Sequence, residues 1–333
     1  CQSVLPALLP LFIYTYGLSL EQAGFLILAN TALSSLLQPL LGYISDKLNQ
    51  PRLIAAGTLL SACSTGMMGF VSSYESLLVC ATLAGVGSSI FHPEGAKIMN
   101  RLGGGKKGKA MGTFAIGGSS GFAFGPLFAG AIAYTVGAHG LAAFTVAGII
   151  ISTVLFLLMP RIVAHAQTID QAVATENPTV AAQPLKNYWK YFAILFIIIL
   201  SQSVNFRVIN AFIPVFWTHE LGTSPEQGSF ALTVFFSIGI FMTYIGGLLG
   251  DKYGPIKIIR LSLLIWLPSM FLLTQVPEFS VKIMMPLAYL ILLMIGAAKA
   301  ISYSPVIVLG QTYLAKSIGF ASGITLGVSQ TIG

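Results

Sequence analysis

Two titratable side chains flank a proline in the string Ser88-Ser-Ile-Phe-His92-Pro93-Glu94, inside an apolar stretch. Imidazole and carboxyl groups take up and release protons, so His92 and Glu94 are candidates for proton coupling. Residues two apart on a straight helix point to opposite sides, so only a kink at Pro93 lets both approach one cavity. Two alternatives stay open for Glu94: a structural ion pair with Lys97, or substrate gating.

Two isolated cations, Arg207 and Lys299, lie deep within other apolar stretches. Charges at such depth are expensive and normally face a cavity. Arg207 shares a helical face with Ser203 and Asn210, and its guanidinium can hold a phosphonate or carboxylate through two hydrogen bonds. We therefore predict that Arg207, Asn210 and Lys299 line a substrate cavity, with snorkelling to the membrane surface as the alternative for both cations.

A polar stripe marks one face of a further apolar segment, with Asn30, Ser34 and Gln38 spaced four residues apart. Such a stripe is typical of a cavity wall, and hydrogen bonding to a neighbouring helix is the alternative. We predict that these three residues also line the substrate cavity.

The pattern Gly-x-x-x-Asp-Lys occurs twice, 205 residues apart, where apolar runs end. The two copies, with the Arg that follows the first, comprise Gly42, Asp46, Lys47, Arg52, Gly247, Asp251 and Lys252. An Asp at such a place can face the N-terminus of a neighbouring helix, where the helix dipole favours an anion. The repetition favours a functional role for these residues over an ordinary charged loop, and it predicts two copies of one multi-helix membrane unit.

Membrane helices must position these side chains, because 55% of the 333 residues are hydrophobic and only 8% are charged. Soluble proteins carry roughly 25% charged residues. Most of the apolar runs reach the ~20 residues that span a bilayer. They predict helices over residues up to 16, then 22–45, 53–72, 76–93, 110–134, 140–159, 191–217, 228–249, 258–275 and 283–304, with a last one from near 318.

The distribution of positive charge fixes an expected orientation. Of the 17 Lys and Arg residues, fourteen fall in loops on one side and only Lys282 falls in a loop on the other. The positively charged side faces the cytoplasm, so the basic net charge of +7 reflects topology, and no nucleic-acid partner is expected. The long polar segment 161–187 then reads as a cytoplasmic linker between a six-helix bundle, 1–160, and a second bundle, 188–333.

Glycines at four-residue spacing mark the predicted fifth helix. Gly117, Gly121 and Gly125 form one smooth face, followed directly by Pro126. Such a face lets another helix approach closely. We predict a helix-packing role for these four residues.

The repeated motif resembles the signature between the second and third helices of the major facilitator superfamily, where it latches the inner side during alternating access. Asn49 stands where that signature usually has Gly. The Gly-x-x-x-Gly-Pro run at Gly121–Pro126 resembles the fifth-helix motif of its drug/proton antiporters. The Phe91-His92-Pro93-Glu94 string, with Leu37–Gly42 and Phe114–Gly118, resembles the fosmidomycin resistance protein family.

This resemblance implies an all-α membrane protein with the major facilitator fold of two six-helix bundles. By symmetry of the halves, we expect the start of helix 1 and the last helices to lie outside this chain. The function implied is proton-coupled efflux of a fosmidomycin-like drug or antibiotic across the cell inner membrane by alternating access. The alternative is a proton-coupled importer of a small organic anion or sugar. The expected partners are a small-molecule substrate, protons and the lipid bilayer, in a monomer.

Two rivals from other classes are a membrane enzyme using His92 and Glu94, and a sensor on the same scaffold that does not transport. No nucleophile, base and metal set supports the enzyme. The run Gly103–Lys109 has the spacing of a phosphate-binding loop, but Ala110 replaces the required Ser or Thr and no strand precedes it. No Cys/His cluster has zinc-ligand spacing, so neither a cofactor nor a metal is expected.

Overall fold

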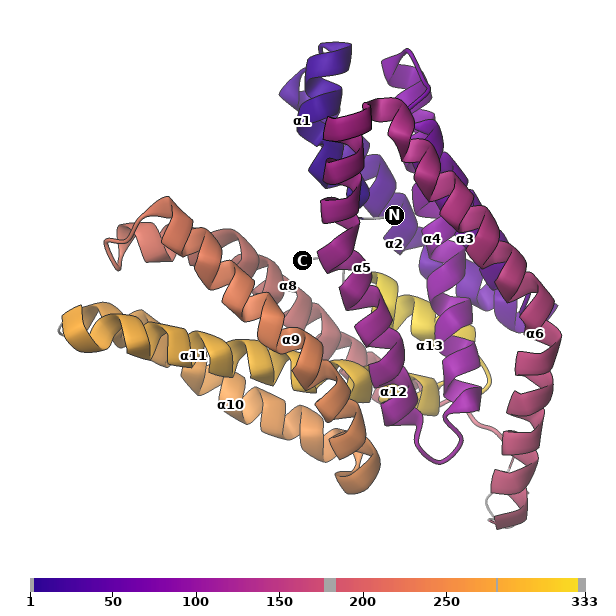
Figure 1. The fold of residues 1–333 in the computed structure, drawn as a ribbon. Coiled ribbons are helices and arrows are strands. Elements are labelled where there is room, and N and C mark those ends of the chain that lie inside the picture. Colours follow the sequence, from indigo (N-terminus) through magenta and orange to yellow (C-terminus); the bar gives the residue numbers. More distant parts are fainter. Residues whose placement is uncertain (1–2, 177–183, 280, 329–333) are drawn as a thin grey trace. The chain divides into compact units, whose positions relative to one another are not determined.

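A computed structural model describes residues 3–176, 184–279 and 281–328, and these ranges are almost wholly helical (Figure 1). The helices are α1 (Val4–Tyr16), α2 (Leu20–Leu48), α3 (Leu53–Met67), α4 (Tyr74–Leu102), α5 (Lys107–Val136), α6 (Ala142–Glu176), α8 (Trp189–His219), α9 (Pro225–Tyr253), α10 (Pro255–Gln275), α11 (Val281–Ile301), α12 (Tyr303–Tyr313) and α13 (Ile318–Gly323). A π-helical turn, Ile324–Val328, follows α13.

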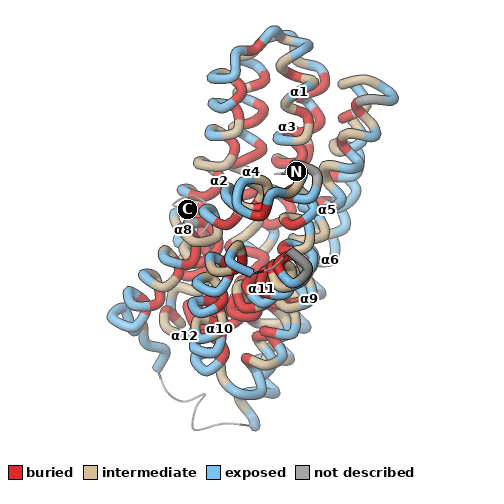
Figure 2. Tube along the Cα trace, turned by 90° about the vertical axis from the view of Figure 1, so that its left-hand side faces the viewer, coloured by how far each residue is buried: buried red, intermediate tan, exposed pale blue. Residues whose placement is uncertain are grey.

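The helices have the length and composition of membrane spans. Within the described ranges, eight helical segments are long and apolar enough to cross a bilayer, and three shorter apolar helices accompany them. Figure 2 shows buried and exposed residues alternating around the helices, and many of the exposed side chains are large and apolar. Such surfaces suit lipid, so the chain is a multi-pass membrane protein.

The chain forms two compact units. The first unit comprises residues 1–102, 117–187 and 314–331, and the second comprises 103–116 and 188–313. Each unit therefore includes one short segment that is joined along the chain to the other unit: 314–331 in the first unit and 103–116 in the second. The division predicted from the sequence, with bundles over 1–160 and 188–333 and a linker over 161–187, stays a prediction.

In the first unit, α2 packs against α4, and α3 packs against α4 and α6. Apolar side chains of α1, α2 and α4, among them Leu8, Phe12, Leu26 and Leu77, form its core. Figure 1 shows the yellow α13 among the purple helices of this unit, beside α2 and α4. In the second unit, α9 packs against α11 and α8 around a core that contains Trp217, Phe235 and Ile295.

The caps of the second helix in each repeat show the duplication at atomic level. The Ser19 hydroxyl accepts a hydrogen bond from the Gln22 N–H at 3.1 Å, and the Gln22 side chain accepts one from the Ser19 N–H at 3.0 Å. Ser224 caps α9 through the Gln227 N–H in the same way, 205 residues later. Both caps begin helices of 29 residues, α2 and α9. Equivalent capping residues thus fix equivalent helices.

Several helix ends differ from the sequence-based ranges, among them the end of α3, which lies at Met67 and not at residue 72. α4 continues through Pro93 to Leu102, which places Glu94 inside the helix instead of at its end. α6 continues to Glu176, because its Ala- and Gln-rich extension favours helix. The helix expected over 283–304 ends at Ile301, and α12 begins at Tyr303, where Pro305 suits the first turn.

Candidate functional site

A buried ionic cluster lies where the end of α2 meets α4. The Glu94 side chain is 1% exposed, and its Oε2 accepts a hydrogen bond from the Ser45 hydroxyl. The Lys97 ammonium lies 4.0 Å from Glu94 Oε2 and 3.8 Å from Asp46 Oδ1. It also donates to the Ser45 carbonyl at 3.0 Å. Lys97 therefore links two carboxylates that belong to different helices.

The Asp46 carboxylate holds the N-terminal end of α13. Its Oδ1 accepts a hydrogen bond from the Gly319 N–H at 2.9 Å, and its Oδ2 accepts one from the Phe320 N–H at 3.0 Å. A carboxylate is stabilised there because the first amides of a helix lack partners within the helix. A Cβ on Gly42 would collide with the Gly319 carbonyl. The first motif thus supplies both the anion and the small residue that lets α13 approach.

The second copy repeats this geometry in the second unit. Asp251 Oδ1 accepts from the Gly108 N–H and Oδ2 from the Lys109 N–H, both at 2.7 Å. Gly247 packs against the Gly108 backbone as Gly42 packs against Gly319. The contact holds the start of α5, which is the counterpart of α13 in the repeat.

The cations of the motifs lie over aromatic rings. The Lys47 ammonium lies 4.6 Å from the centre of the Tyr43 ring, and the Lys252 ammonium lies 5.1 Å from that of Tyr253. The Arg52 guanidinium lies 4.8 Å from the centre of the Phe156 ring on α6. Arg52 thus fastens the connection between α2 and α3 to α6.

The two copies differ in the residues around the Asp. Counted from Asp46 and Asp251, Ser45 corresponds to Gly250. Pro93 and Pro305 follow Asp46 and Asp251 by 47 and 54 residues, each in the second helical stretch after the Asp, α4 and α11–α12. Counted from these prolines, Glu94 corresponds to Val306 and Lys97 to Leu309. Val306 and Leu309 are buried in an apolar cluster with Leu195, Ile199 and Ile259. In the second unit, Asp251 therefore holds the N-terminal end of α5 with apolar residues at the places that Glu94 and Lys97 occupy in the first unit.

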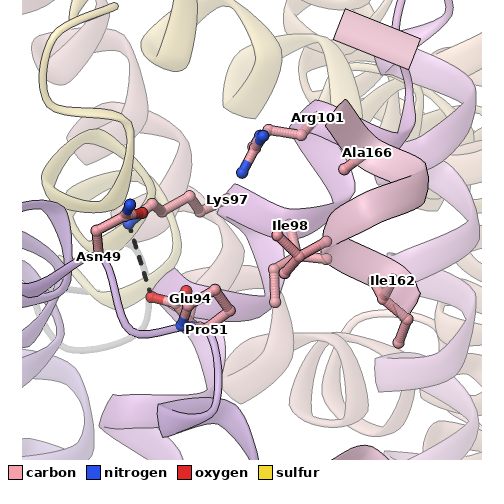
Figure 3. A pocket seen from close by; sticks show the side chains of 9 residues that line it. Asn49, Pro51, Glu94, Lys97, Ile98, Arg101, Ile162 and Ala166 are labelled. Atoms are coloured by element: carbon pink, nitrogen blue, oxygen red, sulfur yellow. Dashed lines mark ion pairs between the residues drawn. The ribbon is translucent and has the colours of Figure 1, made fainter. Parts of the chain in front are cut away.

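His92 and Glu94 are not brought together. His92 is half-buried, and its Nδ1 lies 3.0 Å from the Ser88 carbonyl, which can only accept a hydrogen bond. Glu94 lies on the buried side of α4 with Ser45 and Lys97. The ion pair between Glu94 and Lys97 that was one alternative is present, as Figure 3 shows. The proton-coupling role of both residues stays a prediction.

The polar stripe of α2 is buried in the first unit. Asn30, Ser34 and Gln38 are each 2% exposed or less. The Asn30 amide donates to the Ala81 carbonyl of α4 at 2.8 Å, and the Gln38 backbone packs against Gly323 of α13. In this conformation the stripe therefore packs between helices, and its cavity-lining role stays a prediction.

The second unit holds the cation Lys299 among aromatic rings. Its ammonium lies 5.8 Å from the ring centres of Phe206 and Trp266, and 3.5 Å from the side-chain oxygen of Gln202. The Gln202 amide in turn reaches Ser302 at 3.4 Å. Gln202 was not predicted from the sequence, although a glutamine two residues after the apolar run 192–200 was a usable signal.

Arg207 lies on α8, the helix that also carries Gln202, and its side chain is exposed. Ser203 of the same helix is buried, and its hydroxyl donates to the Ile199 carbonyl. Asn210 is half-buried. The face that Arg207, Ser203 and Asn210 were expected to share is therefore uneven in burial. The substrate-binding role of Arg207 and Asn210 stays a prediction.

The glycine face of α5 makes one close contact. A Cβ on Gly125 would lie 2.7 Å from the Ser3 hydroxyl, which donates to the Gly121 carbonyl at 3.1 Å. A Cβ on Gly117 or Gly121 would meet no described atom within 4 Å. α5 runs through Pro126 to Val136. Close packing is thus seen at Gly125, and at Gly117, Gly121 and Pro126 the packing role stays a prediction.

The family model described as Major Facilitator Superfamily matches residues 1–333, which is the whole chain. The chain belongs to the major facilitator superfamily. This fold and family are those of membrane transporters, so the enzyme alternative is excluded. The latch role that the resemblance implies for the two Asp motifs stays a prediction.

Two curated relatives cover the full length of this major facilitator protein. It is 28% identical over 335 residues to the uncharacterized MFS-type transporter YfnC of Bacillus subtilis (strain 168). It is 28% identical over 334 residues to the fosmidomycin resistance protein of Escherichia coli (strain K12). Each alignment covers 80% of the relative.

Solved major facilitator structures share the fold. The proton:xylose symporter XylE, bound to 6-bromo-6-deoxy-D-glucose, superposes with a TM-score of 0.70 at 16% identity, over 99% of this chain and 82% of that one. FucP in an outward conformation gives 0.64 at 15% identity, over 99% and 87%. At such identities the likeness concerns architecture alone, and it confirms the all-α major facilitator fold.

Proposed function

We propose that this major facilitator protein is a proton-coupled exporter, in which Glu94 carries the proton and Asp46 carries the latch. The observation that supports this most is the position of Lys97, within 4.0 Å of the Glu94 carboxylate and 3.8 Å of the Asp46 carboxylate. When Glu94 is ionised, Lys97 is shared between two anions. When Glu94 binds a proton, Lys97 retains only Asp46 as an anionic partner. Protonation of Glu94 thereby changes the electrostatics of the residue that holds α13.

The latch acts on conformation because of chain connectivity. Segments 314–331 and 103–116 each pack in one unit while their chains continue into the other. A rearrangement between the units can change the contacts of Asp46 and Asp251, because the segments that these residues hold are joined through the chain to the other unit. A ligand or proton that changes the strength of such a contact shifts the populations of the two states.

The internal repeat argues against a purely structural ion pair. At the equivalent place in the second unit, Gly250, Val306 and Leu309 accompany the same contact between Asp and helix end. A buried ion pair is a poor source of stability, because desolvation of the two charges offsets their attraction. The first unit alone carries the set Ser45, Glu94 and Lys97 beside its Asp motif. We infer that this set serves proton coupling, which needs only one of the two units.

For the substrate we propose a small amphiphilic or anionic compound of the fosmidomycin type. The support is the 28% identity to the fosmidomycin resistance protein over this whole chain, together with the cations Lys299 and Arg207 on membrane helices. We propose an orientation in the cell inner membrane with the segment 161–187 in the cytoplasm, from the placement of basic loops. The transporting species is proposed to be a monomer.

Inverted membrane vesicles test the direction of transport. Acidification of their interior should drive labelled fosmidomycin inward if the protein exchanges substrate for protons. Loss of a preloaded compound under the same gradient would instead identify a proton-coupled importer of a small organic anion or sugar.

The variant Glu94→Gln tests the coupling residue. It should abolish gradient-driven accumulation in proteoliposomes and preserve counterflow exchange at equal pH, because glutamine keeps the shape but cannot carry the proton. Gradient-driven accumulation at the wild-type level would remove Glu94 from the mechanism and would move the assignment to His92.

A further inference from the structure

The first unit contains a pocket to which the proposed function assigns no role. It lies where the inner end of α4 meets the extension of α6 and the connection between α2 and α3 (Figure 3). It holds about 300 Å³ of empty space when the open mouth is included. The part enclosed by protein has room for about one water molecule. The pocket is thus too narrow for a drug-sized solute and suits water.

Glu94 forms the polar end of this pocket. The carboxyl is nearly fully buried, and its Oε2 is bonded to Ser45, whereas its Oε1 has no hydrogen-bond partner among the described residues. A buried carboxyl oxygen without a partner is costly, and a water molecule in the pocket would supply the missing donor. The opposite wall is apolar and comes from α6, with Ile162, Val163 and Ala166.

Arg101, which lines the pocket, and other side chains near its rim contact α6. Arg101 of α4 donates to Asp170 Oδ2 of α6 from Nε at 3.1 Å and from Nη2 at 2.9 Å. Both side chains are partly exposed, at 31% and 48%. Arg52 lies against Phe156 on the same helix. Partly exposed ion pairs and cation–π contacts are weak, so this rim can open without unfolding the unit.

We propose that this pocket is the route by which water and protons from the inner side reach Glu94, with the pair Arg101–Asp170 closing its rim. The inference deepens the proposed function, since it concerns how the carboxyl assigned to coupling exchanges its proton. The charged groups around Glu94 are Asp46 of α2 and Lys97 and Arg101 of α4, and Asp170 is the acidic group contributed by α6.

Infrared spectroscopy on purified full-length protein tests the route without a transport assay. The pH is first lowered until Glu94 is protonated, and its carbonyl band is identified by its absence in Glu94→Gln. That band shifts when H2O is replaced by D2O. The time course of that shift measures the access of water to the carboxyl.

Ala166→Leu fills the pocket from α6 and should slow the exchange at least tenfold. The matched control is Ala164→Leu, which adds the same side chain at an exposed position two residues away and should exchange like wild type. Asp170→Asn removes the ion pair at the rim and should speed the exchange severalfold, with Gln167→Ala as its exposed control. Asp170→Asn alone decides the matter if Ala166→Leu does not fold.

Wild-type exchange rates in both Ala166→Leu and Asp170→Asn would overturn the route. This failure is distinct from a failure of the proposed function. If Glu94→Gln still couples flux to the proton gradient while Ala166→Leu slows exchange, the route stands and the coupling assignment is lost. If Glu94→Gln uncouples flux while Ala166→Leu exchanges normally, the coupling assignment stands and the route is lost.

Discussion

The Lys97 ammonium lies 3.8 Å from the Asp46 carboxylate, although the two residues are 51 positions apart and belong to different helices. Asp46 at the same time accepts hydrogen bonds from two backbone amides at the start of α13. One side chain on α4 thus contacts the residue that holds a segment from the far end of the chain. This relationship connects the buried carboxyl cluster to the contact that holds α13.

Asp46→Asn should lower the transport rate severalfold and leave the substrate affinity within a fewfold of wild type. Asparagine can still accept one hydrogen bond from α13, but it loses the charge that the helix N-terminus and Lys97 favour. Counterflow and equilibrium binding in proteoliposomes measure the two quantities separately. Asp251→Asn is the matched variant in the second unit and should act in the same direction. A wild-type rate in Asp46→Asn would show that the contact does not control turnover.

Gly42→Ala should destabilise the protein, by about 1–3 kcal/mol, because the new methyl group collides with the Gly319 carbonyl. Gly24→Ala on the same helix is the control, since a Cβ there meets no described atom within 4 Å. That control should be neutral or stabilising by up to about 1 kcal/mol, as expected for Gly to Ala within a helix. Thermal unfolding in detergent compares the two. Equal stabilities would mean that α13 does not press on Gly42.

Lys299→Met should weaken the binding of an anionic substrate at least tenfold while the protein stays folded. Methionine keeps the apolar stem against Phe206 and Trp266 and removes the cation. Lys299 is half-buried and its ammonium faces the neutral side-chain oxygen of Gln202, so an apolar side chain of similar size should cost little stability. Lys257→Met, at an exposed site, is the control for net charge. Unchanged substrate affinity in Lys299→Met would show that Lys299 does not bind the substrate and serves only the packing of the second unit.

The fold was predictable because lipid imposes strong constraints on sequence. Apolar runs and the two Asp motifs, 205 residues apart, were enough to predict a duplicated all-α membrane protein. The extension of α6 to Glu176 was missed because its Thr and Gln residues resemble a linker, whereas its alanines favour helix. Helix α4 passes through Pro93 because neighbouring groups can compensate for one missing backbone hydrogen bond in a membrane helix.

The candidate site was only partly predictable. The pairing of Glu94 with Lys97 follows from helical spacing, since the residues are three apart. The contacts of Ser45 with Glu94 and of Lys97 with Asp46 depend on how α2 packs against α4, which no local pattern encodes. The same holds for Gln202 and Lys299, which are 97 residues apart and meet only in the folded unit.

The most direct test exchanges the ionic cluster for its counterpart in the repeat, through the triple variant Ser45→Gly, Glu94→Val and Lys97→Leu. The second unit shows that these residue types are compatible with the contact between Asp and helix end. The measurement is gradient-driven accumulation relative to counterflow exchange in proteoliposomes, with the compound transported in the vesicle assay. We predict that counterflow stays within twofold of wild type and that accumulation falls to the level of empty liposomes. Accumulation at the wild-type level in the triple variant would contradict the account.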